Sequence, residues 1–279
     1  SSATVTITDD ETVPSISLSA SANTIAENSG SNITLTATSS IISSSNIVVS
    51  LASSGTATSG SDYGAISSIT IPAGSTTATA TFTPTDDNFY DGGNETAIFD
   101  ISSISGGSAT ENGTQQVTVT ITDNETAPTV TLTSSTNSIA ENGAGTVTLT
   151  ATLSGRTYEN TVVVLSFTGT TSSTDYLGLT SIIIPSGDLT GTENLGIVND
   201  TIFETNETII IDVSSVSGGG ATESGTQQQT VTVTNDDSAP TLTLSSSSSV
   251  DEDGSAITIT GTLSNPTYQT VTVGISASG

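Results

Sequence analysis

The sequence predicts an all-β protein, a row of tandem immunoglobulin-like antiparallel β-sandwiches with about seven strands each. Three observations predict this fold class. One segment recurs along the chain, short runs alternate apolar and hydroxyl side chains with a period of two residues, and clusters of Gly, Ser and Asn separate those runs. No stretch has a convincing helical period.

The recurring segment divides the chain into repeats. It is TITDDETVPSISLS at 6–19, TITDNETAPTVTLT at 120–133 and TNDDSAPTLTLS at 234–245. Its prolines, Pro14, Pro128 and Pro240, give periods of 114 and 112 residues. We therefore expect, in an excerpt of something longer, the last strand of a preceding repeat at 1–11, complete repeats at 12–125 and 126–237, and the N-terminal part of a further repeat at 238–279.

The alternating runs predict the strands within each repeat. QVTVTIT at 116–122 and TATATFT at 77–83 place Val, Ile, Ala or Phe on one face and Thr on the other. Such a strand has one buried and one solvated face, and the β-branched Thr suits the solvated face. In the first complete repeat, similar runs occur near 15–20, 32–38, 46–52, 66–71 and 96–104.

The charge of the chain limits the kinds of partner that it can bind. There are 28 acidic residues against a single basic one, Arg156, and the formal net charge is −27. This charge disfavours nucleic acids and anionic membrane surfaces as partners. No apolar run predicts membrane insertion of this segment. Arg156 lies in a turn before a strand, where we expect a surface contact with a nearby acid and no functional role.

Acidic and amide side chains recur at matched positions of the two complete repeats. PTDDNFYDGGNET at 84–96 corresponds to IVNDTIFETNETI at 197–209, and Glu27 and Asp62 correspond to Glu141 and Asp175. The oxygen donors matched within the two loops are Asp86 with Asn199, Asp87 with Asp200, Asp91 with Glu204 and Glu95 with Glu207. Further acids, at Asp9, Asp10, Asp123 and Asp236, follow the closing strands. Because loops of a Greek-key sandwich converge at one end, these groups are expected to meet.

An external cation explains why so many carboxylates stand together without basic residues. Oxygen donors without nitrogen or sulfur ligands suit Ca²⁺, which takes about 6–8 oxygens in loose geometry. Zinc normally recruits His or Cys, and the chain has neither. The carboxylates exceed what one ion needs, so we expect two or more Ca²⁺ ions per complete repeat. The alternative is a set of solvated turn residues, since Asp and Asn favour turns.

The stretch SGTATSGSDYGAISSITIPAGSTTATATFTPTDDNFYDGGNE at 54–95 resembles the Calx-β domain, a module of sodium–calcium exchangers, integrin β4 and many bacterial surface proteins. Nearly the whole chain shares the resemblance, which implies a Ca²⁺ site at one end of each sandwich. The implied metal ligands are Glu27, Asp62, Asp86, Asp87, Asp91, Glu95 and Asp123 in the first complete repeat, and Glu141, Asp175, Asp200, Glu204, Glu207 and Asp236 in the second. We further expect Asn199, and Asp9, Asp10 and Glu252 in the partial repeats, to be metal ligands. Asn199 departs from the family pattern, as does the Gly-Gly insertion before Glu95.

These observations predict a calcium-rigidified repeat array in an extracellular fibre or a microbial adhesin stalk at the cell surface. Its partners are neighbouring repeats of the same chain, and a filament of many identical chains is a variant of the same hypothesis. Two alternatives stay open: an adhesive module that recognises a glycan or protein, and a calcium-sensing regulatory domain. We expect no enzyme, because the acidic motif recurs in each repeat and no His or Lys is present to activate a nucleophile.

Overall fold

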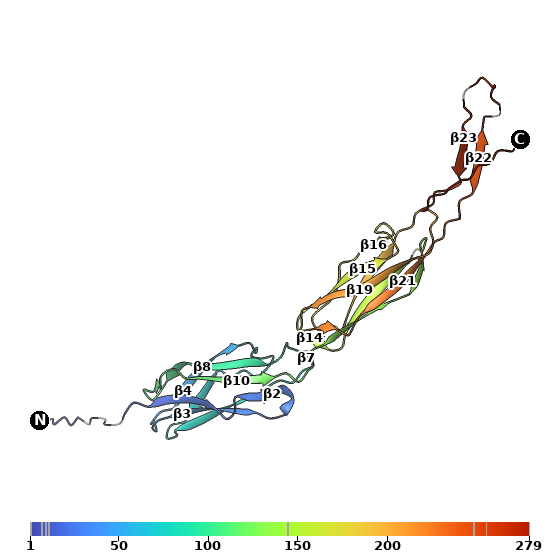
Figure 1. Ribbon diagram of the computed structural model, residues 1–279. Coiled ribbons are helices and arrows are strands. Elements are labelled where there is room, and N and C mark those ends of the chain that lie inside the picture. Colours follow the sequence, from blue (N-terminus) through green and yellow to red (C-terminus); the bar gives the residue numbers. More distant parts are fainter. Residues whose placement is uncertain are drawn as a thin grey trace. The chain divides into compact units, whose positions relative to one another are not determined.

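The computed structural model describes residues 2–6, 8, 10, 12–143, 145–247, 249–254 and 256–278. The chain divides into two compact units, residues 1–127 and 128–279. The expected all-β class is confirmed: both units are built on packed β-sheets (Figure 1). The described part of the chain contains no helix with the length and apolar character needed to traverse a lipid bilayer.

The first unit is a sandwich of a four-stranded and a five-stranded sheet. The four-stranded sheet has the order β6 (Thr77–Phe82), β3 (Ile33–Ser39), β1 (Ser15–Ala20), β9 (Thr110–Glu111). The five-stranded sheet has the order β2 (Thr24–Ala26), β10 (Gln116–Thr122), β8 (Glu95–Ser105), β4 (Ile47–Gly55), β5 (Ser68–Ile71).

The second unit repeats this arrangement with two five-stranded sheets. One has the order β16 (Tyr176–Leu177), β18 (Thr190–Ile197), β13 (Thr146–Leu153), β11 (Thr129–Ser134), β20 (Thr222–Glu223). The other has the order β12 (Ser138–Ala140), β21 (Gln228–Thr234), β19 (Glu207–Ser217), β15 (Thr161–Gly169), β17 (Ser181–Ile184). A hairpin of β22 (Leu242–Ser246) and β23 (Ile259–Leu263) follows, and β7 (Phe89–Tyr90) and β14 (Arg156–Thr157) are short additional strands.

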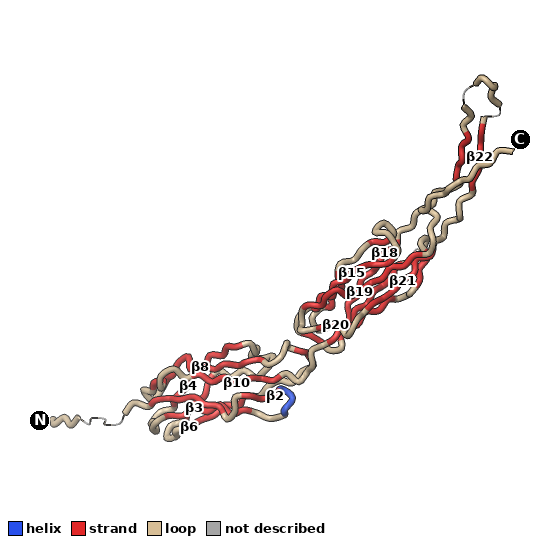
Figure 2. Tube along the Cα trace, viewed as in Figure 1, coloured by secondary structure: helices blue, strands red, loops and turns tan. Residues whose placement is uncertain are grey.

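The seven runs expected from period-two alternation in the first repeat coincide with β1, β3, β4, β5, β6, β8 and β10. Sequence analysis missed β2, β7 and β9, because two or three residues are too few to display a period. One turn of 3₁₀ helix, Glu27–Ser29, follows β2 (Figure 2). It ends at Gly30, whose positive φ of 62° is a conformation that glycine adopts without steric cost.

The core of each unit lies between its two sheets and is made of the apolar residues of the alternating strands. In the first unit Tyr63, Phe82 and Phe99 are fully buried, and their ring centroids lie 5.0 to 5.9 Å apart. In the second unit Leu195 and Ile211 are fully buried. Each core is closed by side chains without any disulfide, since the chain has no cysteine.

Candidate metal centre

Strand register brings distant acids together at one end of each sandwich. In the first unit β2 runs parallel to β10, and Ala26 pairs with Thr122, so Glu27 and Asp123 are the next residues on both strands. In the second unit β12 and β21 pair in the same way, with Ala140 beside Thr234. The alternating apolar pattern that fixes the register therefore also fixes which acids become neighbours.

A first group of acids, here called the linker cluster, includes at least one acid that follows the closing strand of its unit. It contains Glu27, Asp123 and Glu125 in the first unit, and carboxylate oxygens of all three lie within 4.8 Å of one another. The backbone N–H of Asn124 donates to Glu27 Oε1 at 3.2 Å, and the N–H of Glu125 donates to Asp123 Oδ1 at 2.7 Å. The segment that leaves β10 is thus held by the acids themselves.

A second group, here called the loop cluster, is formed by Asp62, Asp91 and Glu95, whose carboxylate oxygens also lie within 4.8 Å of one another. Asp62 closes a turn by accepting the backbone N–H of Thr58. The backbone N–H of Asp91 donates to Asp123 Oδ2 at 2.9 Å, which ties the loop cluster to the linker cluster. Glu95 is the first residue of β8, so the sheet places its backbone.

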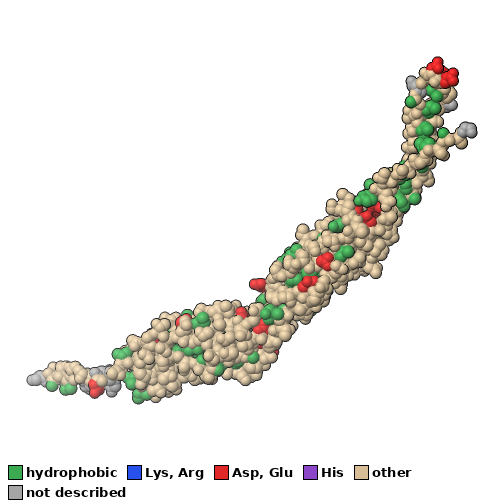
Figure 3. Space-filling view, in the orientation of Figure 1, with side chains coloured by type: hydrophobic (Ala, Val, Ile, Leu, Met, Phe, Trp, Pro, Cys, Tyr) green, Lys and Arg blue, Asp and Glu red, His purple; other side chains and the backbone are tan. Residues whose placement is uncertain are grey.

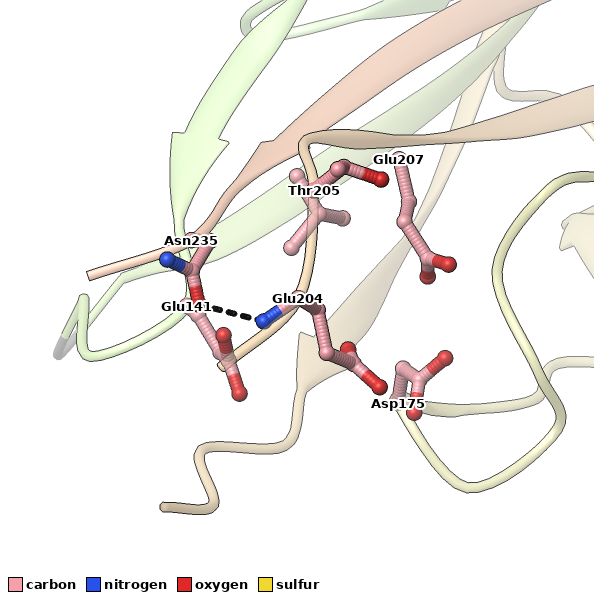
Figure 4. Close-up of a pocket in the computed structure, with 7 residues that line it drawn as sticks. Glu141, Asp175, Glu204, Thr205, Glu207 and Asn235 are labelled. Carbon is pink, nitrogen blue, oxygen red and sulfur yellow. Dashed lines mark hydrogen bonds between the residues drawn. The ribbon is translucent and has the colours of Figure 1, made fainter. Parts of the chain in front are cut away.

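The second unit also has two groups of three carboxylates. Its linker cluster is Glu141, Asp200 and Asp237, and its loop cluster is Asp175, Glu204 and Glu207. Glu141 and the loop cluster line one small pocket, into which their side chains point (Figure 4). The backbone N–H of Glu204 donates to Asn235 Oδ1 at 3.2 Å, in the place of the contact between Asp91 and Asp123.

Crowding and burial raise the pKa of several of these carboxyl groups. Burial raises the pKa of Glu27 from 4.5 to about 8, and the neighbouring carboxyls of Glu125 and Asp123 add to the rise. Burial likewise raises the pKa of Glu95 to about 7 and that of Asp91 to about 6. In the second unit burial raises the pKa of Glu207 to about 7, and those of Glu141 and Glu204 rise for the same reason. Without a cation, ionisation of these groups is disfavoured.

Three carboxylate oxygens of the clusters are buried without a hydrogen-bond donor: Asp91 Oδ1, Glu125 Oε2 and Asp237 Oδ2. A buried acceptor without a partner is costly, and native proteins rarely leave one unsatisfied. A chain with one basic residue has almost no cationic side chains to satisfy them. The donor set consists of hard oxygen atoms, so the residues present fit Ca²⁺ as the missing partner.

The structure places the other expected ligands as follows. Asp87 is half-buried, accepts the N–H of Phe89 at 2.8 Å and raises the pKa of Asp91, but belongs to neither cluster as defined here. Asp10, Asp86, Asn199, Asp236 and Glu252 are exposed, and Asp9 lies outside the described residues. The acidic tip of the β22–β23 hairpin, residues 251–253, is conspicuous on the surface (Figure 3). For each of the expected ligands named in this paragraph, binding of a metal ion stays a prediction.

Sequence analysis missed two members of the linker clusters, Glu125 and Asp237. Aligning the three recurring segments on their prolines would have found them, because Glu11, Glu125 and Asp237 then occupy one column. The same alignment sets Asn235 opposite Asp123 and moves Asp236 opposite Asn124. Arg156 also differs from expectation: its guanidinium donates to the backbone carbonyl of Gly187 rather than to a carboxylate.

Sandwich units in tandem, each with acidic clusters at the end of its closing strand, define a class of cation-binding β-sandwich repeats. The Calx-beta domain family matches residues 9–125 and 123–237. The chain therefore belongs to the Calx-beta domain family, whose domains bind calcium. The finer boundaries expected at 12–125 and 126–237 stay predictions.

Solved structures were also compared with the chain. The CBD12 structure of CALX1.2 is 16% identical with a TM-score of 0.36, and the match covers 78% of this chain and 99% of that one. The Yersinia pseudotuberculosis adhesin InvE is 13% identical with a TM-score of 0.32, and the match covers 78% of this chain and 58% of that one. The comparison with curated proteins returned no match.

Proposed function

We propose that the chain is a calcium-binding repeat array, stiffened by calcium, in the stalk of an adhesin or in an extracellular fibre of a microbial cell. The observation that carries the proposal is the set of buried carboxylate oxygens without donors in both units, at Asp91, Glu125 and Asp237. Such atoms in a chain of net charge −27 call for a cation from outside.

The linker and loop clusters are the residues that would hold the ions. Each unit has two clusters of three carboxylates, which supports two or more ions per complete repeat. Bound Ca²⁺ supplies the positive charge that the clusters lack and accepts their oxygens as ligands. The side chains of Asp123 and Asn235 hold the backbone of the acidic loop in each unit, so the ligand loop is partly ordered in advance.

The position of the linker cluster connects ion binding to mechanics. Asp123 and Glu125 follow β10 directly, and the next strand, β11, begins at Thr129. Fixing these acids fixes the backbone that leaves the sandwich, whereas their mutual repulsion loosens it when no cation is present. Extracellular calcium is millimolar, a concentration at which the weak sites of extracellular modules are filled.

The adhesive alternative expects an exposed aromatic patch. Among the described residues, the large exposed aromatic side chains are Tyr158 and Tyr268. They occupy matched positions of the second complete repeat and of the partial repeat after it, in GRTYEN and NPTYQT, so that each of these repeats carries one isolated exposed tyrosine and no patch forms. This favours the stalk over a dedicated recognition surface.

Thermal unfolding of the whole chain tests the proposal. We expect the melting temperature to be higher in millimolar Ca²⁺ than in chelator. At a hundredfold excess of Ca²⁺ over its dissociation constant, binding to the folded state adds about 2.7 kcal/mol to the free energy of unfolding. Mg²⁺ at the same concentration should have a much smaller effect, because it demands a stricter geometry.

Two variants locate the effect. Glu27→Gln and Glu141→Gln should each weaken calcium binding by at least about tenfold, as losses around metal ligands do. Glu193→Gln, at an exposed acid outside the clusters, is the matched control and should leave binding unchanged. Melting that is indifferent to both ions would sink the proposal.

A further inference from the structure

The second unit contains a joint between its sandwich and the hairpin that follows. The backbone N–H of Phe203 donates to the carbonyl of Pro266 at 3.1 Å, and the N–H of Tyr268 donates to the carbonyl of Phe203 at 3.3 Å. Phe203 and Thr267 form a parallel β-bridge, and the Thr267 hydroxyl donates to the Phe203 carbonyl at 3.2 Å. Segment 266–268 therefore adds to the acidic loop by backbone pairing.

The loop that accepts this segment carries candidate metal ligands on both sides of Phe203. Asp200 belongs to the linker cluster and Glu204 to the loop cluster. The loop backbone is held by acids or their neighbours: the N–H of Asp200 donates to Glu141 at 3.2 Å, and the N–H of Ile202 donates to Asp200 at 2.7 Å. The position of Phe203 thus depends on groups that an ion would fix.

The covalent connection to the hairpin starts from the same cluster. Asp237, a member of the linker cluster, precedes the linker 238–241 that leads into β22. Asn235 Nδ2 donates to the carbonyl of Asp237 at 3.0 Å, and Asn265 Nδ2 donates to the carbonyl of Ser238 at 2.7 Å. The hairpin is therefore attached at two points, through the linker after Asp237 and through the bridge at Phe203.

We propose that the linker cluster Glu141–Asp200–Asp237 is a clasp that joins both attachment points of the following repeat, so that calcium binding and docking of segment 266–268 strengthen each other. The inference rests on the proposed function, since it assumes that the cluster binds calcium. It adds the partner, which is segment 266–268, and the coupling, which is reciprocal by thermodynamic necessity.

The test uses the full chain with one spin label on the sandwich and one on the hairpin. The sequence has no cysteine, so Ser166→Cys in β15 and Ser246→Cys in β22, both exposed, are labelled uniquely. Pulsed electron spin resonance then gives the distribution of distances between the labels. We expect a narrow distribution with Ca²⁺ and a broad one with chelator.

Tyr268→Pro removes the N–H that Tyr268 donates to Phe203, on the docking side of the joint and in a residue that belongs to neither cluster. We expect it to leave the distribution broad even with Ca²⁺ and to weaken calcium binding by about fivefold or more, the lower end of typical coupling between sites. Tyr268→Ala is the matched control. It keeps the backbone donor and loses only a side chain that is 71% exposed, so it should behave as the parent chain does.

The outcomes separate the two proposals. A parent chain that shows no calcium binding by calorimetry overturns the proposed function and the clasp with it. Calcium binding by the parent together with an unchanged distribution and affinity in Tyr268→Pro overturns the clasp and leaves the proposed function standing. Equal effects of Tyr268→Pro and Tyr268→Ala would also overturn it, because the side chain rather than the backbone bridge would then be responsible.

Discussion

The acid-rich ends of the two units share most of their positions, but they differ in one member of the linker cluster, Asp123 or Asp200, and in their contacts. Glu27 accepts the N–H of Asn124 from the segment after the closing strand, whereas Glu141 accepts the N–H of Asp200 from the acidic loop. The position after the closing strand is Asp123 in the first unit and Asn235 in the second, and both accept a backbone N–H of the acidic loop. An oxygen acceptor is therefore sufficient to place the loop, and the charge at this position is free to vary.

The cores of the two units differ more than their acidic ends. Ser53 pairs with Phe99 across β4 and β8, whereas Phe167 pairs with Ile211 across β15 and β19. At this matched cross-strand pair, the aromatic residue is on β8 in the first unit and on β15 in the second. The sandwich tolerates this exchange because a core needs filled volume rather than particular residues, while each cluster needs oxygen atoms at fixed places.

The largest expected effect comes from the cores. Phe82→Ala should lower the stability of the first unit by about 3–5 kcal/mol, because it opens a cavity beside Tyr63 and Phe99. Leu195→Ala, at the matched position of the second unit, should cost about 2–5 kcal/mol and less than Phe82→Ala, since no aromatic pair is lost. Amide hydrogen exchange, followed on peptides from each unit, measures both. A larger loss for Leu195→Ala would contradict the assigned difference between the cores.

An intermediate effect is expected from pH in the presence of chelator. The pKa of Glu27 is raised from 4.5 to about 8, so the folded state binds more protons than the unfolded state between these values. The stability that the bound proton of Glu27 contributes is therefore fully present below pH 4.5 and is lost as the pH rises towards about 8. In the second unit the pKa of Glu207 reaches about 7, so the loss in the first unit should extend to higher pH.

Melting temperatures of the chain between pH 4.5 and pH 8 measure this loss. Glu27→Gln removes the titrating group and should flatten the upper end of the profile of the first unit, while Glu193→Gln should not. Stability that rises with pH in chelator would show that the folded state does not hold these protons.

The smallest effect is expected from exchanging the residue after the closing strand. Asn235→Asp keeps an oxygen that can accept the N–H of Glu204 and adds a charge beside the clusters. It should strengthen calcium binding by the second unit by less than about tenfold, or 1.4 kcal/mol, and lower its melting temperature in chelator. Asp123→Asn in the first unit should do the reverse. Calorimetric titration of both variants measures the pair, and changes of the same sign in both units would contradict the comparison.

The sequence was sufficient to predict the fold class and the long strands, because period-two alternation over six or more residues reports a buried and a solvated face directly. It also predicted that Glu27 would meet acids from the closing strand. It did not predict the parallel pairing of β2 with β10 that brings them together, since three residues carry no period. Glu125 and Asp237 were missed because they follow the closing strands by several residues and look like linker. The exposure of Asp86 depends on loop conformation, which alternation does not encode.

Arg156 has a consequence for the resistance of the protein to digestion. Proteases that cut after lysine or arginine have a single target bond in all 279 residues, between Arg156 and Thr157. The Arg156 side chain is half-buried and bonded to the Gly187 carbonyl, and Thr157 is fully buried. Digestion at this bond requires local unfolding first. Because its single basic residue is protected in this way, the folded chain is a poor substrate for proteases that cut after lysine or arginine.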